Sequence, residues 1–207
     1  MLHRSFSIRH TQKNFSRVVQ YYDFWGKLTE QKAINAAVSI ADIQNGVKIL
    51  DVGVGTGQLF EKIINLNDEG FNSGLDLSYS MLTRAKEKLN SKLANYSLAM
   101  GNAYKLPYKG GIFDFIFRSY VLDLLPENTF GIVLSEFSRV MKSGGIGILI
   151  TMSIGDKLYN KIWYFAAKYF PSLLTNCRPV KLTNFLEGAR FKIIDKQIIF
   201  KILFPAK

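Results

Sequence analysis

The stretch ILDVGVGTG, Ile49–Gly57, decides the fold of this 207-residue chain. The apolar, β-branched run Val47–Val52 before the glycines predicts a short buried strand. Three glycines at alternate positions then break the strand, and Gln58–Asn65 has the pattern of a helix. Strand, glycine turn and helix together predict a nucleotide-type site, because glycines let a ligand approach the backbone and a helix start offers free N–H groups.

The glycine spacing disfavours two common phosphate-binding motifs. The dinucleotide pattern G-x-G-x-x-G needs a glycine at position 58, but that residue is Gln58 and the third glycine is Gly57. The P-loop pattern G-x-x-x-x-G-K-S/T is absent as well. A nicotinamide dehydrogenase is therefore disfavoured. The loop has no Lys or Arg to favour a pyrophosphate, and Asp51 just before it favours a ligand with a cationic group.

Strands and helices alternate on both sides of this loop. Further strands are expected over Phe71–Leu77, Tyr96–Met100, Phe113–Phe117 and Gly145–Thr151. Helices are expected over Thr11–Ala41, Ser80–Lys92, Phe130–Met141, Tyr159–Phe170 and Leu182–Gly188. This alternation predicts an α/β fold with a doubly wound, mostly parallel sheet and helices on both faces. Phe191–Asp195 and Ile198–Phe204 then predict an antiparallel hairpin at the sheet edge.

The length predicts a single domain over residues 1–207. Within it we expect an N-terminal helical cap over 12–44, a cofactor-binding core over 47–154, and substrate-side helices with the edge hairpin over 155–207. The aromatic helix Tyr159–Phe170 has two interpretations. It packs against the sheet, or it forms an apolar lid or a membrane-touching element helped by neighbouring lysines.

The positive charge lies entirely at the two ends of the chain. The chain has 27 Lys+Arg and 16 Asp+Glu, a formal net charge of +11. Residues 1–22 have four basic and no acidic residues, and residues 155–207 have ten basic and three acidic ones. The stretch between them has thirteen of each sign (27 − 4 − 10 and 16 − 3) and is neutral. The ends therefore indicate a polyanionic partner, either nucleic acid or an anionic membrane surface.

Cysteine and histidine are too scarce for several kinds of site. Cys177 is the one cysteine, which excludes an internal disulfide framework and a cysteine-based zinc cluster. His3 and His10 are the only histidines, so a metal site or a histidine-based triad is not expected. No apolar run approaches the ~18 residues of a membrane span and no secretory signal is visible. We therefore expect a cytoplasmic protein.

Five stretches, in order and spacing, resemble the class I S-adenosylmethionine-dependent methyltransferases. Ile49–Gly57 looks like motif I, Gly74–Leu82 like the second-strand motif, and Gly101–Tyr108 like the G-D-A-x-x-L-P-F stretch. Phe113-Asp114 and Met141–Gly145 resemble the start of the fourth strand and the L-K-P-G-G turn. The resemblance covers residues 12 to 206 and implies a seven-stranded sheet of order 3-2-1-4-5-7-6, with S-adenosylmethionine as cofactor and S-adenosylhomocysteine as product.

The resemblance also implies a set of cofactor-binding residues. Asp51 and Gly53 would line the methionine side, Asp76 would hold the ribose, and Asn102 with Ala103 would meet the adenine. The full set is Asp51, Gly53, Gly55, Gly57, Asp76, Leu77, Met81, Asn102, Ala103 and Arg118. Asn102 departs from the Asp usual in the family. An amide carbonyl would then replace the carboxylate acceptor for the exocyclic amine of adenine.

Within this class, a pattern near the N-terminus resembles the F-x3-A-x2-Y-D entry of the quinone-biosynthesis (ubiquinone and menaquinone) C-methyltransferases. Its residues are Phe15, Val19, Tyr22 and Asp23. In that pattern Tyr22 would lie over cofactor and substrate. The tail over 177–191 resembles phospholipid-type relatives. The R-N-x-x-D motif of the quinone enzymes is replaced by RSYVLD over 118–123, so the acceptor stays open.

The function implied is SN2 transfer of a methyl group to a small, hydrophobic or membrane-associated acceptor, such as a quinone precursor or a phospholipid amine. Tyr22, Tyr120 and Asp123 are the candidate catalytic residues, with a base needed only if the acceptor must lose a proton. One alternative is an RNA methyltransferase, suggested by the charge but not by any RNA-binding module or N-P-P-Y motif. Another is a non-catalytic cofactor-binding scaffold. The basic ends favour peripheral contact with an anionic membrane.

Overall fold

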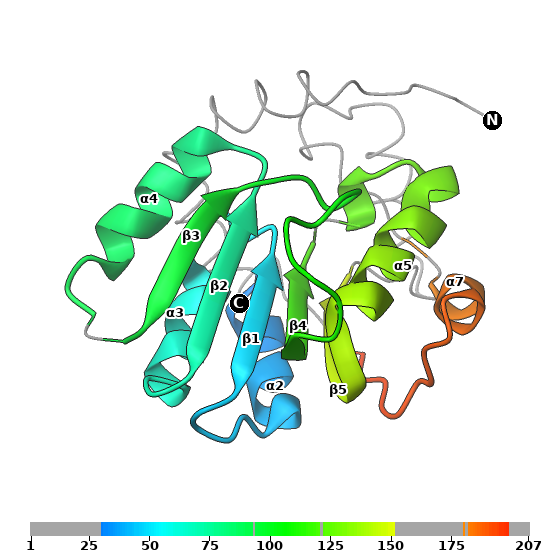
Figure 1. Ribbon diagram of the computed structural model, residues 1–207, viewed down its shortest axis with the longest axis horizontal. Coiled ribbons are helices and arrows are strands. Elements are labelled where there is room, and N and C mark those ends of the chain that lie inside the picture. Colours follow the sequence, from blue (N-terminus) through cyan, green and yellow to red (C-terminus); the bar gives the residue numbers. More distant parts are fainter. Residues whose placement is uncertain (1–29, 93, 121, 152–179, 181, 199–207) are drawn as a thin grey trace, which may run out of the picture.

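The structure, a computed structural model, describes residues 30–92, 94–120, 122–151, 180 and 182–198. In this part of the chain five parallel strands form one sheet of order β3-β2-β1-β4-β5 (Figure 1). The strands are β1 (Lys48–Val52), β2 (Phe71–Asp76), β3 (Tyr96–Met100), β4 (Phe113–Ser119) and β5 (Met141–Ile150). The α-helices are α2 (Gln31–Ala41), α3 (Gln58–Leu66), α4 (Tyr79–Leu89), α5 (Phe130–Val140) and α7 (Thr183–Gly188). Two 3-10 helices, η1 (Leu122–Leu124) and η2 (Glu127–Thr129), follow β4.

The helices cover both faces of the sheet. On one face, α2 and α3 share an apolar cluster with Ile49 and Phe117, and α3 packs against α4 through Phe60 and Leu89. On the other face, α5 and α7 cover the sheet together with the long connection between β3 and β4, which contributes Leu106. Figure 1 shows this arrangement, with every strand pointing the same way. The carboxyl ends of all five strands therefore meet at one edge.

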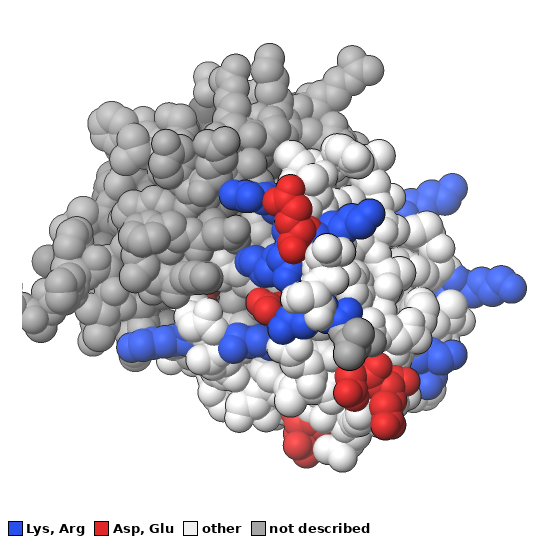
Figure 2. Space-filling view, turned by 90° about the vertical axis from the view of Figure 1, so that its left-hand side faces the viewer, with Lys and Arg blue, Asp and Glu red and all other residues white. Residues whose placement is uncertain are grey.

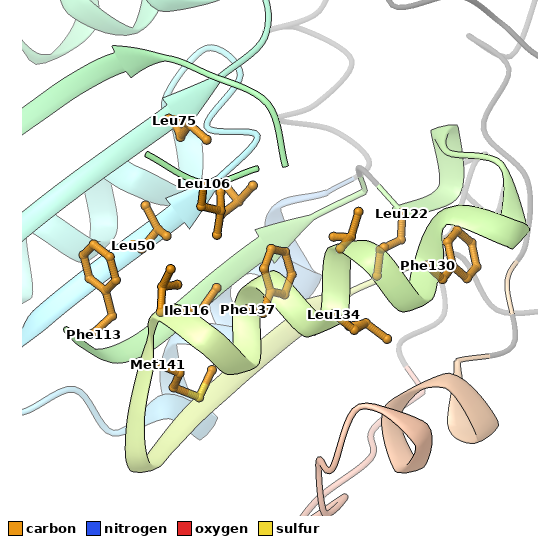
Figure 3. Close-up of a cluster of buried hydrophobic side chains, with 13 residues drawn as sticks. Leu50, Leu75, Leu106, Phe113, Ile116, Leu122, Phe130, Leu134, Phe137 and Met141 are labelled. Carbon is orange, nitrogen blue, oxygen red and sulfur yellow. The ribbon is translucent and has the colours of Figure 1, made fainter. Parts of the chain in front are cut away.

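The main core lies between the sheet and α5. Its buried side chains come from four strands, from the β3–β4 connection, from η1 and from one face of α5 (Figure 3). They are Leu50, Val52, Leu75, Leu106, Phe113, Ile116, Leu122, Phe130, Val133, Leu134, Phe137, Val140 and Met141. The α5 residues recur at helical spacing, which explains why one stripe of this helix is buried. This core fixes β4 and the β3–β4 connection, and both carry candidate site residues.

The sequence predicted these five strands and the helices α3, α4, α5 and α7 to within a few residues, and the structure confirms them. The strand β5 differs, because it begins at Met141 and not at Gly145. Phe113 pairs with Met141 and Phe115 with Ile146, so Lys142–Gly145 bulge out of the ladder. Gly144 has a φ of 78° there, which allows the tight bend.

The predicted edge hairpin stays a prediction, because the structure describes only its first arm. Residues 191–198 have no regular secondary structure, so the strand predicted over Phe191–Asp195 is not confirmed. Ile193 and Ile194 are exposed there. The second arm lies outside the described residues beyond Ile198, as do most of the N-terminal cap and the aromatic helix Tyr159–Phe170. In the described part of the chain, no helix is long and apolar enough to cross a membrane.

Candidate active site

The glycine loop after β1 needs glycine at three places. Gly53, Gly55 and Gly57 have φ values of 82°, 54° and 82°, a region that L side chains rarely adopt. Gly57 is also the N-cap of α3, and a Cβ at this residue would lie 3.3 Å from the Cβ of Ala85. The loop bends over the end of β2, because the N–H groups of Gly53 and Val54 both donate to the carbonyl of Leu75, at 2.7 and 3.0 Å.

The carboxylate of Asp76, at the end of β2, ties this loop to the next one. Its Oδ2 accepts from the N–H of Gly55 at 2.8 Å, and its Oδ1 accepts from the N–H of Ser78 at 2.8 Å. Burial raises the pKa of Asp76, while the N–H groups of Ser78, Gly55 and Leu77 act in the opposite direction. A carboxylate has about four lone-pair sites on its two oxygens, so with three N–H groups bound it can still accept from a ribose hydroxyl.

Asp51 is the buried acid of the site. It lies in β1 just before the glycine loop and is 1% exposed. Its Oδ1 has no hydrogen-bond partner among the described residues. Burial raises the pKa of Asp51 to about 8, and the neighbouring charge of Asp76 adds to the rise. A buried carboxylate with an unused oxygen beside a glycine loop fits the cationic part of a ligand.

A turn after β3 lies directly beside Asp76. The N–H of Gly101 donates to the backbone carbonyl of Asp76 at 2.9 Å. The Oδ1 of Asn102 accepts from the N–H of Tyr104 at 3.0 Å, and the carbonyl of Asn102 accepts from the N–H of Lys105 at 3.1 Å. The polar ends of β1, β2 and β3, which are neighbours in the sheet, thus form a continuous row.

A second polar group lies at the end of β4. Arg118 is 1% exposed, its guanidinium carbon lies 5.4 Å from the ring centre of Phe137, and none of its nitrogens has a hydrogen-bond partner in the described residues. Burial lowers the pKa of Arg118 to about 9, while the charges of Asp123 and Tyr104 raise it. Asp123 is itself completely buried. The buried cation of Arg118 and the buried acid Asp123 therefore lie close to one another, near the turn that carries Asn102 and Tyr104.

Three further candidates lie in different surroundings. Tyr120 is buried in the apolar cluster beneath α2, with a φ of 53° that is unusual for a bulky residue. Met81 is 2% exposed and packs in the first turns of α4, whereas Leu77 is only half-buried. Tyr120 thus belongs to the cluster beneath α2, whereas Asp123 lies near Arg118. Tyr22 lies outside the described residues.

The chain is similar to known methyltransferases in sequence and in fold. Residues 49–145 match the family model described as a methyltransferase domain. The demethylmenaquinone methyltransferase of Staphylococcus epidermidis is 27% identical over 93% of this chain and 82% of its own length. That of Shouchella clausii is 35% identical over 61% of this chain and 54% of its own length. A phosphoethanolamine N-methyltransferase of Haemonchus contortus, solved with S-adenosylhomocysteine, has the same fold, with a TM-score of 0.71 and 18% identity over 89% of this chain and 44% of its own.

The chain is a class I S-adenosylmethionine-dependent methyltransferase. The charges of the site fit this cofactor, which has an ammonium and a sulfonium for the unused oxygen of Asp51, and a ribose diol for Asp76. Among the described residues of the methyltransferase, no group of three or more His, Cys, Asp and Glu side chains could hold a metal ion.

An ion pair on α5 holds the turn of the methyltransferase that carries Asn102. Glu136 accepts from the N–H of Leu106 at 2.7 Å, and Arg139 donates to the carbonyls of Tyr108 and Leu106 at 2.7 and 3.0 Å. The two side chains also bind one another, with the Nε of Arg139 2.6 Å from the Oε1 of Glu136. The sequence patterns did not single out Glu136 and Arg139. Their spacing of three within a helix indicates an ion pair but not the backbone groups that it holds.

Replacing Arg139 with alanine is expected to lower the free energy of unfolding by about 1–2 kcal/mol, because two backbone carbonyls and Glu136 lose their donor. Urea unfolding of this variant measures the change. The matched control is Arg84→Ala, which removes an exposed ion pair to Glu87 on α4 and is expected to cost about 0.5 kcal/mol or less. Equal losses in the two variants would contradict the bracing role of Arg139.

Proposed function

We propose that this methyltransferase acts on a small apolar acceptor of the quinone type. The observation that carries the proposal is the similarity to the demethylmenaquinone methyltransferase of S. epidermidis, which runs over 93% of this chain and is not confined to the cofactor-binding motifs. A phospholipid amine is the less favoured acceptor, because the phosphoethanolamine enzyme is 18% identical, a level that indicates a shared fold alone. An RNA acceptor has no comparable relative among the proteins named above.

The cofactor-binding part of the proposal follows the row of polar groups along the sheet edge. Asp51 would take the ammonium group, the glycine loop would lie along the amino-acid part, and Asp76 would accept from the ribose hydroxyls. Asn102 and Ala103 would then meet the base, with Leu77 and Met81 forming apolar contacts nearby. The bound cofactor supplies a methyl group activated by its sulfonium. The main task of the protein is therefore to align the acceptor and exclude water.

The acceptor-side residues are proposed from the end of β4. Methylation of a quinol ring carbon forms a C–C bond, breaks the S–CH3 bond and releases the ring proton, so a base must take that proton. Asp123 is the favoured base, because it is buried beside Arg118, and an arginine can stabilise a developing oxyanion on the ring. Tyr22 and Tyr120 are the remaining candidates. The role of Tyr120 would be indirect, because its unusual backbone conformation sets the direction of the chain after β4.

The ends of the chain are proposed to form the substrate side. Residues 12–44 would cap the site and residues 155–207 would complete it, so both basic ends would face the place where the acceptor enters. Figure 2 shows the side of the molecule where α4 lies, and basic and acidic side chains are intermixed on its described part. An apolar quinone resides in a membrane, so the basic ends would bind anionic lipid from the cytoplasmic side without spanning the bilayer.

Transfer of labelled methyl groups tests the proposal. The full chain is incubated with methyl-labelled S-adenosylmethionine and demethylmenaquinone reduced to the quinol, presented in vesicles with or without anionic lipid. Labelled menaquinol is expected in both kinds of vesicle, with severalfold more in anionic vesicles and a loss of this difference at high salt. Vesicles that contain phosphatidylethanolamine but no quinol, and total RNA, are the competing acceptors. Label in either of these, and none in the quinone, would overturn the proposed acceptor.

A further inference from the structure

Arg118 is a buried cation whose hydrogen-bond donors are unused. It lies near the carboxyl end of β4, is 1% exposed, and none of its three side-chain nitrogens has a hydrogen-bond partner in the described residues. A guanidinium has five N–H donors, and leaving them unpaired inside a fold is costly. Asp123 is the buried acid nearby, but five donors can serve one carboxylate and one further oxygen. Arg118 therefore fits an anionic oxygen of a ligand.

Tyr104 brings a phenol to the same place. Its half-buried ring packs against the core between the sheet and α5. Its hydroxyl lies 3.4 Å from the Oγ1 of Thr129, the residue just before α5. Phe137, whose ring lies near Arg118, belongs to the same core and points from α5 toward β4 (Figure 3). The charge of Tyr104 acts to raise the pKa of Arg118, so the two side chains are close to one another.

The phenol proton of Tyr104 is available to a ligand. Thr129 has one hydroxyl proton, which it donates to the carbonyl of Pro126 at 2.6 Å. In the contact between Thr129 and Tyr104 the phenol is therefore the donor, and at 3.4 Å this hydrogen bond is long. An anionic oxygen that approaches Tyr104 can take the proton in a shorter and stronger bond. Tyr104 and Arg118 thus present donors from the connection after β3 and from the end of β4.

We propose that Tyr104 and Arg118 together bind the ionised ring oxygen of the methyl acceptor, so that this enzyme selects acceptors with an acidic ring hydroxyl. The inference rests on the proposed function, which places the acceptor at the end of β4. A negative charge on the ring oxygen is shared with the neighbouring ring carbon, which makes that carbon a better nucleophile. Donors that are in place before the acceptor arrives stabilise this charge without reorganisation. One turn would then meet the purine through Asn102 and the acceptor through Tyr104.

An acceptor analogue that cannot be turned over tests this site by binding alone. The probe is 2-hydroxynaphthoquinone, an anion at neutral pH, and it is compared with its neutral 2-methoxy ether. Each is titrated calorimetrically into the full chain saturated with S-adenosylhomocysteine. The wild-type protein is expected to bind the anion at least tenfold more tightly than the ether. Tyr104→Phe is expected to weaken binding of the anion by about tenfold and to leave that of the ether unchanged.

Tyr96→Phe is the matched control. The hydroxyl of Tyr96 also makes a long hydrogen bond, to the carbonyl of Leu89 at 3.3 Å, but its ring packs in the cluster beneath α4. This variant should bind both probes as the wild type does. Arg118→Lys keeps the charge but loses the fork of donors, so it should weaken the anion more than the ether.

The ratio of the two affinities separates acceptor binding from a structural role. Equal binding of anion and ether by the wild type would overturn the inference. So would an unchanged anion affinity in Tyr104→Phe, or an equal loss of both probes, because a loosened fold weakens both. These results can occur while the quinol is still methylated, and then the inference alone fails. If the anion binds as expected but no label reaches the quinol, the proposed acceptor is wrong and the oxyanion site stands.

Discussion

Replacing Asp76 with alanine is expected to weaken the binding of S-adenosylhomocysteine by about 1–3 kcal/mol, which is roughly 5- to 150-fold. The variant loses the acceptor for the ribose diol. It also loses the acceptor for the N–H of Gly55, which holds the middle of the glycine loop at 2.8 Å. Both losses act on the same ligand, so the effect should lie in the upper part of this range. Calorimetric titration of the ligand measures it.

Two variants separate these contributions. Asp76→Asn keeps one oxygen that can accept from a backbone N–H, but it presents an amide NH2 group in place of the second oxygen. It should therefore bind S-adenosylhomocysteine more weakly than the wild type, with less loosening of the loop than in Asp76→Ala. Asp114→Ala is the matched control. Its carboxylate also accepts from a backbone N–H, that of Lys48 at 2.9 Å, and binds Lys142 at 2.6 Å, but it lies near the amino end of β4. Unchanged affinity in Asp76→Ala would show that the ribose does not bind at Asp76.

The sequence is informative where the backbone itself demands particular residues. Gly53, Gly55 and Gly57 are needed because the loop adopts positive φ, so the loop and its strand could be identified from spacing alone. Asp51 and Asp76 follow directly, since parallel strands bring their carboxyl ends to one edge. The strand order could be predicted from the resemblance, and the structure confirms it for five strands.

The sequence is less informative where contacts with residues distant in the chain determine the local structure. Phe191–Asp195 has the composition of a strand, but a strand at an edge forms only where a neighbouring chain segment pairs with it. The bulge at Lys142–Gly145 depends on the register between β4 and β5. The direction of the Asn102 amide depends on the N–H of Tyr104, a contact that no residue pattern specifies. The sequence identifies such groups, but their hydrogen-bond partners determine which donors and acceptors each group has left for a ligand.

Asp51 is expected to make cofactor binding depend on pH. Its pKa is raised to about 8 by burial and by Asp76, so in the free protein it is mostly protonated at neutral pH. A cationic ligand favours the ionised form, and binding therefore releases a proton. The affinity for S-adenosylhomocysteine should rise by about one log unit per pH unit between pH 6 and 7, a range in which the ligand's amine stays charged. Asp51→Asn should bind more weakly, with no such slope.

The same substitution is expected to stabilise the ligand-free protein. The unfolded chain releases the proton of Asp51 near pH 4, the ordinary range of Asp, whereas the folded chain keeps it up to about pH 8. The folded state thus binds more protons over this window, and the free energy of unfolding falls as the pH rises. Asp51→Asn removes this decrease, so its advantage over the wild type should grow from pH 5 to pH 8 in urea unfolding. A parallel pH dependence in both proteins would show that Asp51 is ionised in the free site. A buried acid that weakens the empty fold while it strengthens cofactor binding is expected of a binding group, and not of a structural one.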